Sequence, residues 1–242
     1  MIRIKRVLIL ISLLIWASII PAYALDTREK STIPPQLLSP SFGEGIVMYF
    51  LDVGQADATI IQCNGMSMMI DCGKQGDAAK ICRFLYDIGV ECLDSIIITH
   101  PHQDHMGGLE DILNEFRVDD LYIAKTNDFV GEENVRERYR SAIEKARGKG
   151  KIIHGITPYT YEMEDFYLAD AYIHFLGPVE ESYTDNNNMS LVLKIEYGGK
   201  TFLFPGDADR EEITDIMKKK GRQVFQANVL HAPHHGGTTS NE

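Results

Sequence analysis

The first part of the chain places short apolar runs between turn-forming residues. β-Branched and aromatic residues are concentrated in residues 46–52 and 58–63, and a third apolar run covers residues 67–70. Asn64-Gly65 between the last two runs is a strong signal for a two-residue hairpin turn. We therefore expect three short strands here, with the second and third joined by a tight turn.

The spacing of the apolar residues changes in the next segment. Between residues 78 and 88 the apolar side chains recur at spacings of three and four, and Asp77 is placed to cap a helix. Residues 93–99, with three successive isoleucines at 96–98, are expected to form a buried strand, and residues 109–116 return to the helical spacing. These patterns predict a helix, a strand and a second helix.

The second half also mixes both periods. The expected helices are residues 132–147 and 209–219, and the expected strands are residues 121–124, 151–154, several short ones within 159–176, then 190–197, 200–204 and 227–231. Paired strands together with strands that alternate with helices indicate a layered α/β fold. With 242 residues, 44% of them hydrophobic, the chain can bury one good core, so we expect one domain.

The N-terminus is set apart by composition. Three basic residues within positions 3–6 precede an apolar run over 7–20, and Ala22-Tyr23-Ala24 is a small-x-small cleavage pattern. Residues 1–24 are interpreted as a secretory signal peptide, so we expect an exported protein in the periplasm, outside the cell or at the cell surface. No integral membrane association is expected after cleavage; an uncleaved anchor is the alternative. The proline-containing residues 25–45 suit a flexible linker to a domain at 46–242.

Removing the signal peptide leaves 21 basic against 35 acidic residues, a net charge of −14. A polyanion needs Lys and Arg to displace its counterions, so strong electrostatic affinity for nucleic acid is not expected. This charge does not exclude cleavage of a phosphodiester at a metal centre. The four cysteines permit two disulfides in an exported chain, and the pairing stays open.

The strongest chemical signal follows the strand expected at 93–99. His100, His102, Asp104 and His105 lie within six residues, and a Gly-Gly pair then leads into a helical pattern. Imidazoles and a carboxylate at this density suit a borderline-soft divalent cation such as zinc. His100 and His102 are two residues apart, so in an extended segment their side chains point to the same side.

The order H-x-H-x-D-H between a strand and a helix resembles the metal-binding signature of the metallo-β-lactamase superfamily. Three further stretches are similar to the metallo-β-lactamase domain of ComEC-type DNA-uptake (competence) proteins: 49–58, 187–193 and 233–237. The resemblance runs from about residue 46 to the end. It implies an α/β fold of the αββα four-layer sandwich type, here with an incomplete C-terminus.

The resemblance also implies a site for two divalent ions, with zinc favoured over manganese. The expected ligands are His100, His102, Asp104, His105, Asp207 as a bridge between the ions, and His235, with His234 as the alternative. Asp71 is expected to orient the histidine loop through hydrogen bonds, and Asp57 to shape the floor of the site. The histidine of the 234/235 pair that is not a ligand would contact substrate or support the ligands.

One position departs from the superfamily pattern. Many members carry a third histidine of the first metal site where this chain has Asn186, four residues before Ser190. An amide oxygen is a poorer zinc ligand than an imidazole. The first ion is therefore expected to be weakly held or better suited to manganese, and Asn188 is a candidate for substrate binding.

These features favour an exported, metal-dependent hydrolase that uses a metal-bound hydroxide, with Asp104 as the catalytic residue that orients it. Phosphodiesters are the preferred substrate class, in DNA, in nucleotides or at the cell surface. Two alternatives remain: a non-catalytic binding module stabilised by metal, and a hydrolase of acyl, lactone or β-lactam substrates. The sequence leaves the oligomeric state open.

Overall fold

The computed structural model describes residues 44–125, 133–149 and 151–237, all within one compact unit that covers residues 36–242. The predicted signal peptide and nearly all of the predicted linker lie outside the described residues, as does the first residue of the helix predicted at 132–147. None of the helices within the described ranges is both long and apolar enough to cross a membrane.

The first sheet has six strands in the order β1-β2-β3-β4-β5-β6. The strands are β1 (Ile46–Phe50), β2 (Thr59–Cys63), β3 (Met66–Ile70), β4 (Cys92–Ile98), β5 (Arg117–Ala124) and β6 (Ile152–Ile156). The first three are antiparallel, whereas β3 to β6 run parallel. Asn64 and Gly65 turn between β2 and β3 with φ angles of 44° and 89°, which confirms the predicted hairpin.

The second sheet has five strands in the order β11-β10-β9-β8-β7. They are β7 (Phe166–Leu168), β8 (Ala171–Phe175), β9 (Leu193–Tyr197), β10 (Lys200–Phe204) and β11 (Val229–Leu230). Neighbouring strands are antiparallel except β10 and β11, which are parallel. β11 and β1 are therefore edge strands of their sheets.

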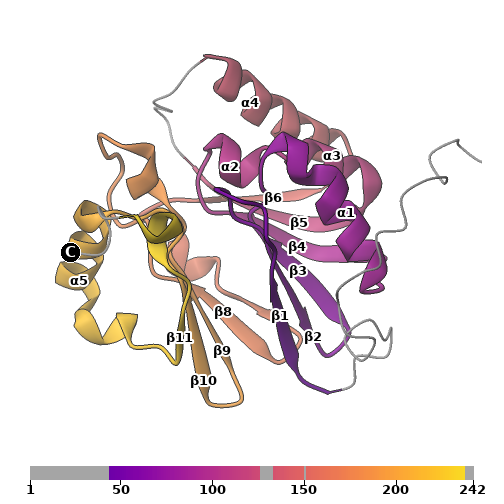
Figure 1. Cartoon of the computed structure of the whole chain (residues 1–242). Coiled ribbons are helices and arrows are strands. Elements are labelled where there is room, and N and C mark those ends of the chain that lie inside the picture. The colour runs from indigo at the N-terminus through magenta and orange to yellow at the C-terminus, as the bar shows by residue number, and fades with distance from the viewer. Residues whose placement is uncertain (1–43, 126–132, 150, 238–242) are drawn as a thin grey trace, which may run out of the picture. The chain divides into compact units, whose positions relative to one another are not determined.

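Helices cover the two sheets on opposite sides (Figure 1). The helices α1 (Ala78–Asp87), α3 (Leu109–Glu115) and α4 (Glu133–Gly148) lie against the first sheet, and α5 (Arg210–Lys220) lies beyond the second. Alternation along the strands builds both inner layers. Ile60, Met69 and Ile96 pack with the first set of helices, while Ile61, Met68 and Ile97 pack between the sheets. The αββα prediction is confirmed.

Several local predictions were incomplete. A short helix, α2 (Gln103–Met106), forms inside the histidine loop, and β5 begins at Arg117 rather than at 121. β9 begins at Leu193 rather than at 190, because residues Asn186–Met189 form a 3-10 turn, η4, and residues 190–192 connect this turn to the strand. The other 3-10 segments are η2 (Gln75–Asp77), η3 (Tyr161–Met163), η5 (Arg222–Phe225) and η6 (Pro233–Gly236). All four cysteines are free thiols.

Candidate metal centre

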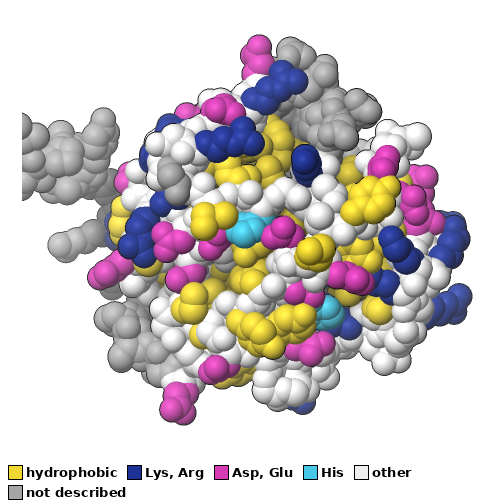
Figure 2. All heavy atoms as spheres, turned by 180° about the vertical axis from the view of Figure 1, so that it is seen from behind, with side chains coloured by type: hydrophobic (Ala, Val, Ile, Leu, Met, Phe, Trp, Pro, Cys, Tyr) yellow, Lys and Arg dark blue, Asp and Glu magenta, His cyan; other side chains and the backbone are white. Residues whose placement is uncertain are grey.

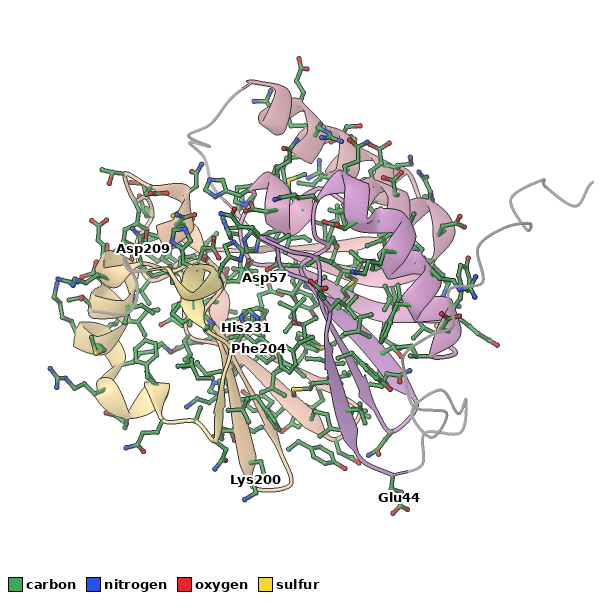
Figure 3. The ribbon with its side chains drawn as sticks, in the orientation of Figure 1. Glu44, Asp57, Lys200, Phe204, Asp209 and His231 are labelled. Carbon is green, nitrogen blue, oxygen red and sulfur yellow. The ribbon has the colours of Figure 1, made fainter. Side chains whose placement is uncertain are left out.

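The ends of four strands bring the predicted ligands together. β3 ends before Asp71, β4 before the histidine loop, β10 before Asp207, and β11 before the His234-His235 pair. β3 and β4 are parallel, as are β10 and β11, so within each pair the carboxyl ends lie at the same edge. Figure 3 shows Asp57, His231, Phe204 and Asp209 toward this end of the two sheets.

The first two histidines of the loop form one half of the site. His100 is almost fully buried, and its Nε2 lies 3.0 Å from Nδ1 of His102. Two nitrogens bound to one tetrahedral zinc at the usual bond length are separated by roughly 3.3 Å. The separation found here is that of a hydrogen bond between the two rings, and it is close to the spacing that two ligands of one ion would have.

Asp207 is the centre of the whole arrangement. Its Oδ2 lies 3.3 Å from Nε2 of His105 and 3.4 Å from Nε2 of His235. The Nε2 atoms of His100 and His234 each lie 3.8 Å from the same oxygen. Four imidazoles from two sheets therefore point one ring nitrogen at a single carboxylate oxygen, as a bridging ligand requires.

The other nitrogen of each of these rings faces a second polar group. Nδ1 of His105 lies 2.8 Å from Asp71, and Nδ1 of His234 lies 3.0 Å from Asp209. The remaining two contacts are His100 to the Thr99 hydroxyl at 3.2 Å and His235 to Asp57 at 3.6 Å. A group that holds Nδ1 of a histidine favours the tautomer in which Nε2 is the metal-binding nitrogen.

Asp71 ties its histidine to the strand. Its Oδ1 accepts the Thr99 backbone N–H at 2.8 Å, and its Oδ2 accepts the Thr99 hydroxyl at 2.8 Å in addition to His105. Asp71 has a φ of 58°, in the left-handed region that Asp and Asn tolerate better than most residues. The predicted orienting contact to the histidine loop is thus present.

Asp57 lies in the same cluster. Asp57, His105, Asp207 and His235 can each offer a ligand atom, and these four atoms all lie within 4.8 Å of one another. The Asp57 backbone is fixed to the loop, because its N–H donates to the Asp104 carbonyl at 3.1 Å. Asp104 itself approaches His235, with 3.5 Å between its Oδ2 and Nε2.

His234 and His235 both have strained backbones, with φ angles of 49° and 51°. Two successive non-glycine residues in the left-handed region carry a conformational cost, which persists where the surrounding structure holds them. Here the turn aims both imidazoles at Asp207 from different sides. The left-handed turn places both rings at the site, although only one was expected to be a ligand.

Burial and the neighbouring carboxylates shift the pKa values of the site histidines. Burial lowers the pKa of both His100 and His102, which keeps them neutral and able to bind a cation. Burial alone would lower the pKa of His105, but the carboxylates of Asp71 and Asp207 raise it to about 10. Asp104, Asp207 and Asp57 raise the pKa of His235 to about 12. Protons thus occupy ligand nitrogens when metal is absent.

Unpartnered atoms test whether metal fits. Among the described residues, Oδ1 of Asp207 is buried without a hydrogen bond, and the buried Nε2 atoms of His105 and His235 make no well-aligned hydrogen bond, only ion-pair contacts with Asp207 and Asp104. Buried polar atoms nearly always have a partner. Imidazole and carboxylate groups are common zinc ligands. Bound divalent cations would therefore give these buried atoms partners, and the residues present fit such ions.

Asn186 and Asn188, the two asparagines predicted to contribute to the site, lie in η4. Both are buried, and Oδ1 of Asn188 accepts the backbone N–H groups of Asp209 at 3.0 Å and Glu212 at 3.4 Å. Asn188 therefore caps the start of α5. The substrate role predicted for Asn186 and Asn188 stays a prediction.

Four supporting residues were missed from the sequence: Thr99, Asp209, His231 and Ser190. Ser190 is fully buried, and its hydroxyl accepts the Asp207 backbone N–H at 3.1 Å. Nε2 of His231 lies 3.6 Å from Asp57. Only Asp209 had a readable signal, as the second carboxylate of Gly-Asp-Ala-Asp; the others depend on distant parts of the chain.

Comparison with known proteins agrees with this geometry. The family model of the metallo-beta-lactamase superfamily matches residues 51–242 of the chain. "ComE operon protein 3" of Bacillus subtilis is 32% identical over 164 residues, covering 66% of this chain and 19% of that protein. "Competence protein ComA" of Neisseria gonorrhoeae is 25% identical over 190 residues, covering 78% of this chain and 23% of that protein. The chain thus spans about a fifth of the length of these relatives.

The fold is shared with solved structures. A putative metallo-beta-lactamase from Thermotoga maritima superimposes with a TM-score of 0.52 at 13% identity, covering 76% of this chain and 94% of that one. A metallo-beta-lactamase mutant from Cronobacter sakazakii gives 0.51 at 14% identity, covering 76% and 73%. At such identities the likeness concerns the fold alone.

Proposed function

Because the chain belongs to the metallo-beta-lactamase superfamily, we propose that it is a metal-dependent hydrolase with two divalent ions bound around Asp207. One observation carries the proposal: four Nε2 atoms converge on Oδ2 of Asp207. The buried Oδ1 of the same carboxylate makes no hydrogen bond. A carboxylate surrounded in this way suits a bridge between two ions.

Both histidines of the left-handed turn serve as ligands in this proposal. His234 approaches Asp207 at the same distance as His100, and it would join His100 and His102 at the first ion. His235 approaches Asp104 as well as Asp207, and it would join Asp104 and His105 at the second ion. His234 would thereby replace the histidine that many superfamily members carry at the position of Asn186 and that this chain lacks, and the Asp209 carboxylate at its Nδ1 would strengthen it as a ligand.

Two bound divalent ions would supply a water-derived nucleophile at neutral pH and neutralise charge that develops on the substrate. The chain's own residues do the positioning. Asp104 is ionised, since its contact with His235 outweighs burial and lowers its pKa, so it can accept a proton or a hydrogen bond from the attacking water. Asp71 and Asp209 face Nδ1 of His105 and of His234, which favours the tautomer that carries the proton there and directs Nε2 at Asp207.

Phosphodiesters are the proposed substrate class, in an exported protein related to DNA-uptake domains. The support is the similarity to "ComE operon protein 3" and "Competence protein ComA", together with the arrangement proposed for two ions, which suits in-line displacement at phosphorus. Figure 2 shows acidic side chains interspersed with basic ones on the face seen from behind. With a net charge of −11 for the full chain, binding would depend on the ions rather than on a basic surface.

The test combines metal content with hydrolysis. The protein and an Asp104→Asn variant are loaded with zinc or manganese, analysed for metal per chain, and assayed with bis-(para-nitrophenyl) phosphate. We expect two ions and phosphodiesterase activity in the parent, with both reduced in the variant. Asp94→Asn is the matched control, because Asp94 accepts a hydrogen bond from the Ser67 backbone far from the metal centre.

Other results would refute the proposal. Two ions without hydrolysis of any phosphodiester, but with turnover of a lactone or a β-lactam, would move the chain to the acyl-transfer alternative. Two ions with no hydrolysis of either class would leave a metal-stabilised binding module. A folded protein that binds no zinc or manganese would refute the metal centre itself.

A further inference from the structure

An aromatic surface adjoins the metal centre at the end of β1. We define the aromatic shelf as the rings of Phe50, Phe204 and His231. Their centroids are separated by 5.7 to 6.2 Å, and their planes are within 13° to 22° of one another. Phe204 is buried, whereas Phe50 is 51% exposed. A buried ring and a half-buried imidazole thus support an aromatic face that is open to solvent.

The shelf is connected to the proposed ligands by two contacts. Nε2 of His231 lies 3.6 Å from Oδ1 of Asp57, and Oδ2 of Asp57 lies 3.6 Å from Nδ1 of His235. The backbone N–H of His231 donates to the Leu203 carbonyl at 2.9 Å, which fixes the imidazole beside β10. In Figure 3, Asp57, His231 and Phe204 lie together above the strands. The shelf therefore keeps a fixed position relative to the ions.

Single exposed apolar side chains are common on protein surfaces and carry no functional meaning by themselves. Phe50 differs because it stacks on His231, which directly follows the exposed apolar residues of β11, Val229 at 42% and Leu230 at 59% exposed. The other exposed aromatic rings of the described residues, such as Tyr86 on α1, have no such connection to the metal centre.

We propose that the aromatic shelf binds the planar base of a nucleotide substrate whose phosphodiester lies at the ions. Aromatic rings stack with an offset at centroid distances of 4.5–7 Å, and stacking on a base needs no particular sequence. Asp57 at the inner edge of the shelf can also accept hydrogen bonds from the ribose or the base. This inference rests on the proposed function, since it assigns the substrate class of the same site.

Product binding tests the shelf directly. Calorimetry measures the dissociation constants of AMP and of ribose-5-phosphate on the metal-loaded parent and on Phe50→Leu, which keeps apolar volume but removes the ring. Tyr86→Leu is the matched control, because Tyr86 is 54% exposed and packs on Phe116 instead. Phe50→Trp, which keeps a ring, serves as a second variant.

We expect the parent, Tyr86→Leu and Phe50→Trp to bind AMP at least about fivefold more tightly than ribose-5-phosphate, the lower end of a base-stacking contribution. Phe50→Leu should lose this preference. Equal binding of both compounds by the parent, or an unchanged preference in Phe50→Leu, would overturn the inference.

Hydrolysis of bis-(para-nitrophenyl) phosphate, measured on the same preparations, separates the two proposals. Hydrolysis without a preference for AMP overturns the shelf and leaves the phosphodiesterase proposal standing. A preference for AMP that depends on Phe50, in a protein that hydrolyses no phosphodiester, overturns the enzymatic function and leaves the shelf as a nucleotide-binding surface.

Discussion

Replacing Asp71 by Asn tests how the second ion is held. Asparagine tolerates the left-handed backbone that Asp71 adopts at a φ of 58°, so the loop should keep its conformation. The side chain keeps its shape but exchanges one carboxylate oxygen for an NH2 group. That oxygen position currently accepts from both the Thr99 hydroxyl and Nδ1 of His105, each at 2.8 Å.

The new amide cannot satisfy every partner. If its oxygen keeps the Thr99 backbone N–H, the NH2 group faces His105 and favours the tautomer with the proton on Nε2, which blocks the atom aimed at Asp207. If the amide is reversed, two donors face each other at Thr99. Either arrangement loses one hydrogen bond to a charged group, worth about 1.5–3 kcal/mol. Such supporting contacts change metal affinity by about 10–100-fold.

Competition with a chromophoric chelator at pH 7.5 measures the affinity of each ion. We expect the second ion, at His105, to lose about 10–100-fold in affinity in Asp71→Asn, with the first ion less affected. Asp94→Asn provides the same chemical change away from the centre and should match the parent. If Asp71→Asn has the parent's circular dichroism spectrum and binds both ions with the parent's affinities, the orienting role of Asp71 is refuted.

Four further outcomes are expected. Zinc binding at pH 7.5 should release about two protons, because the pKa values of His105 and His235 without metal are about 10 and about 12. Calorimetry in buffers of different ionisation enthalpy measures the number of protons released, and a release of zero would contradict the prediction. The pKa values of these two histidines in the folded protein exceed the value of about 6.5 in the unfolded chain. Their protonation therefore adds to the free energy of unfolding of the metal-free protein, fully below about pH 6.5, and urea unfolding should show this stabilisation lost as the pH rises through about 10. His234→Gln and His235→Gln should each remove about one ion per chain by elemental analysis; loss from only one variant would leave a single histidine as ligand. Gly206→Ala should destabilise the protein by about 1–3 kcal/mol in urea unfolding, because its φ is 58° and a Cβ would lie 3.0 Å from both Ser190 and Thr99, whereas Gly148→Ala, with open space around it, should change stability little.

Local sequence was sufficient to predict most elements and to name the candidate ligands, whose role stays a prediction. The periods of two and three to four residues predicted the strands and helices, because side-chain burial imposes them directly on the sequence. The loop from His100 to His105 could be interpreted on its own, since histidines and a carboxylate at this density are typical of a metal site. Asp207 and the histidine pair could be assigned from their places after strands and from the resemblance of the motifs.

The tertiary structure decided how these ligands are supported. Thr99, Ser190 and His231 are ordinary residues in sequence. They matter because the fold places them against three distant carboxylate residues, Asp71, Asp207 and Asp57 respectively. The sequence also left one histidine of the pair unassigned, since it shows neither the left-handed turn nor the approach of both rings to Asp207. Which atoms converge is fixed by the packing of two sheets, and no local pattern carries that long-range geometry.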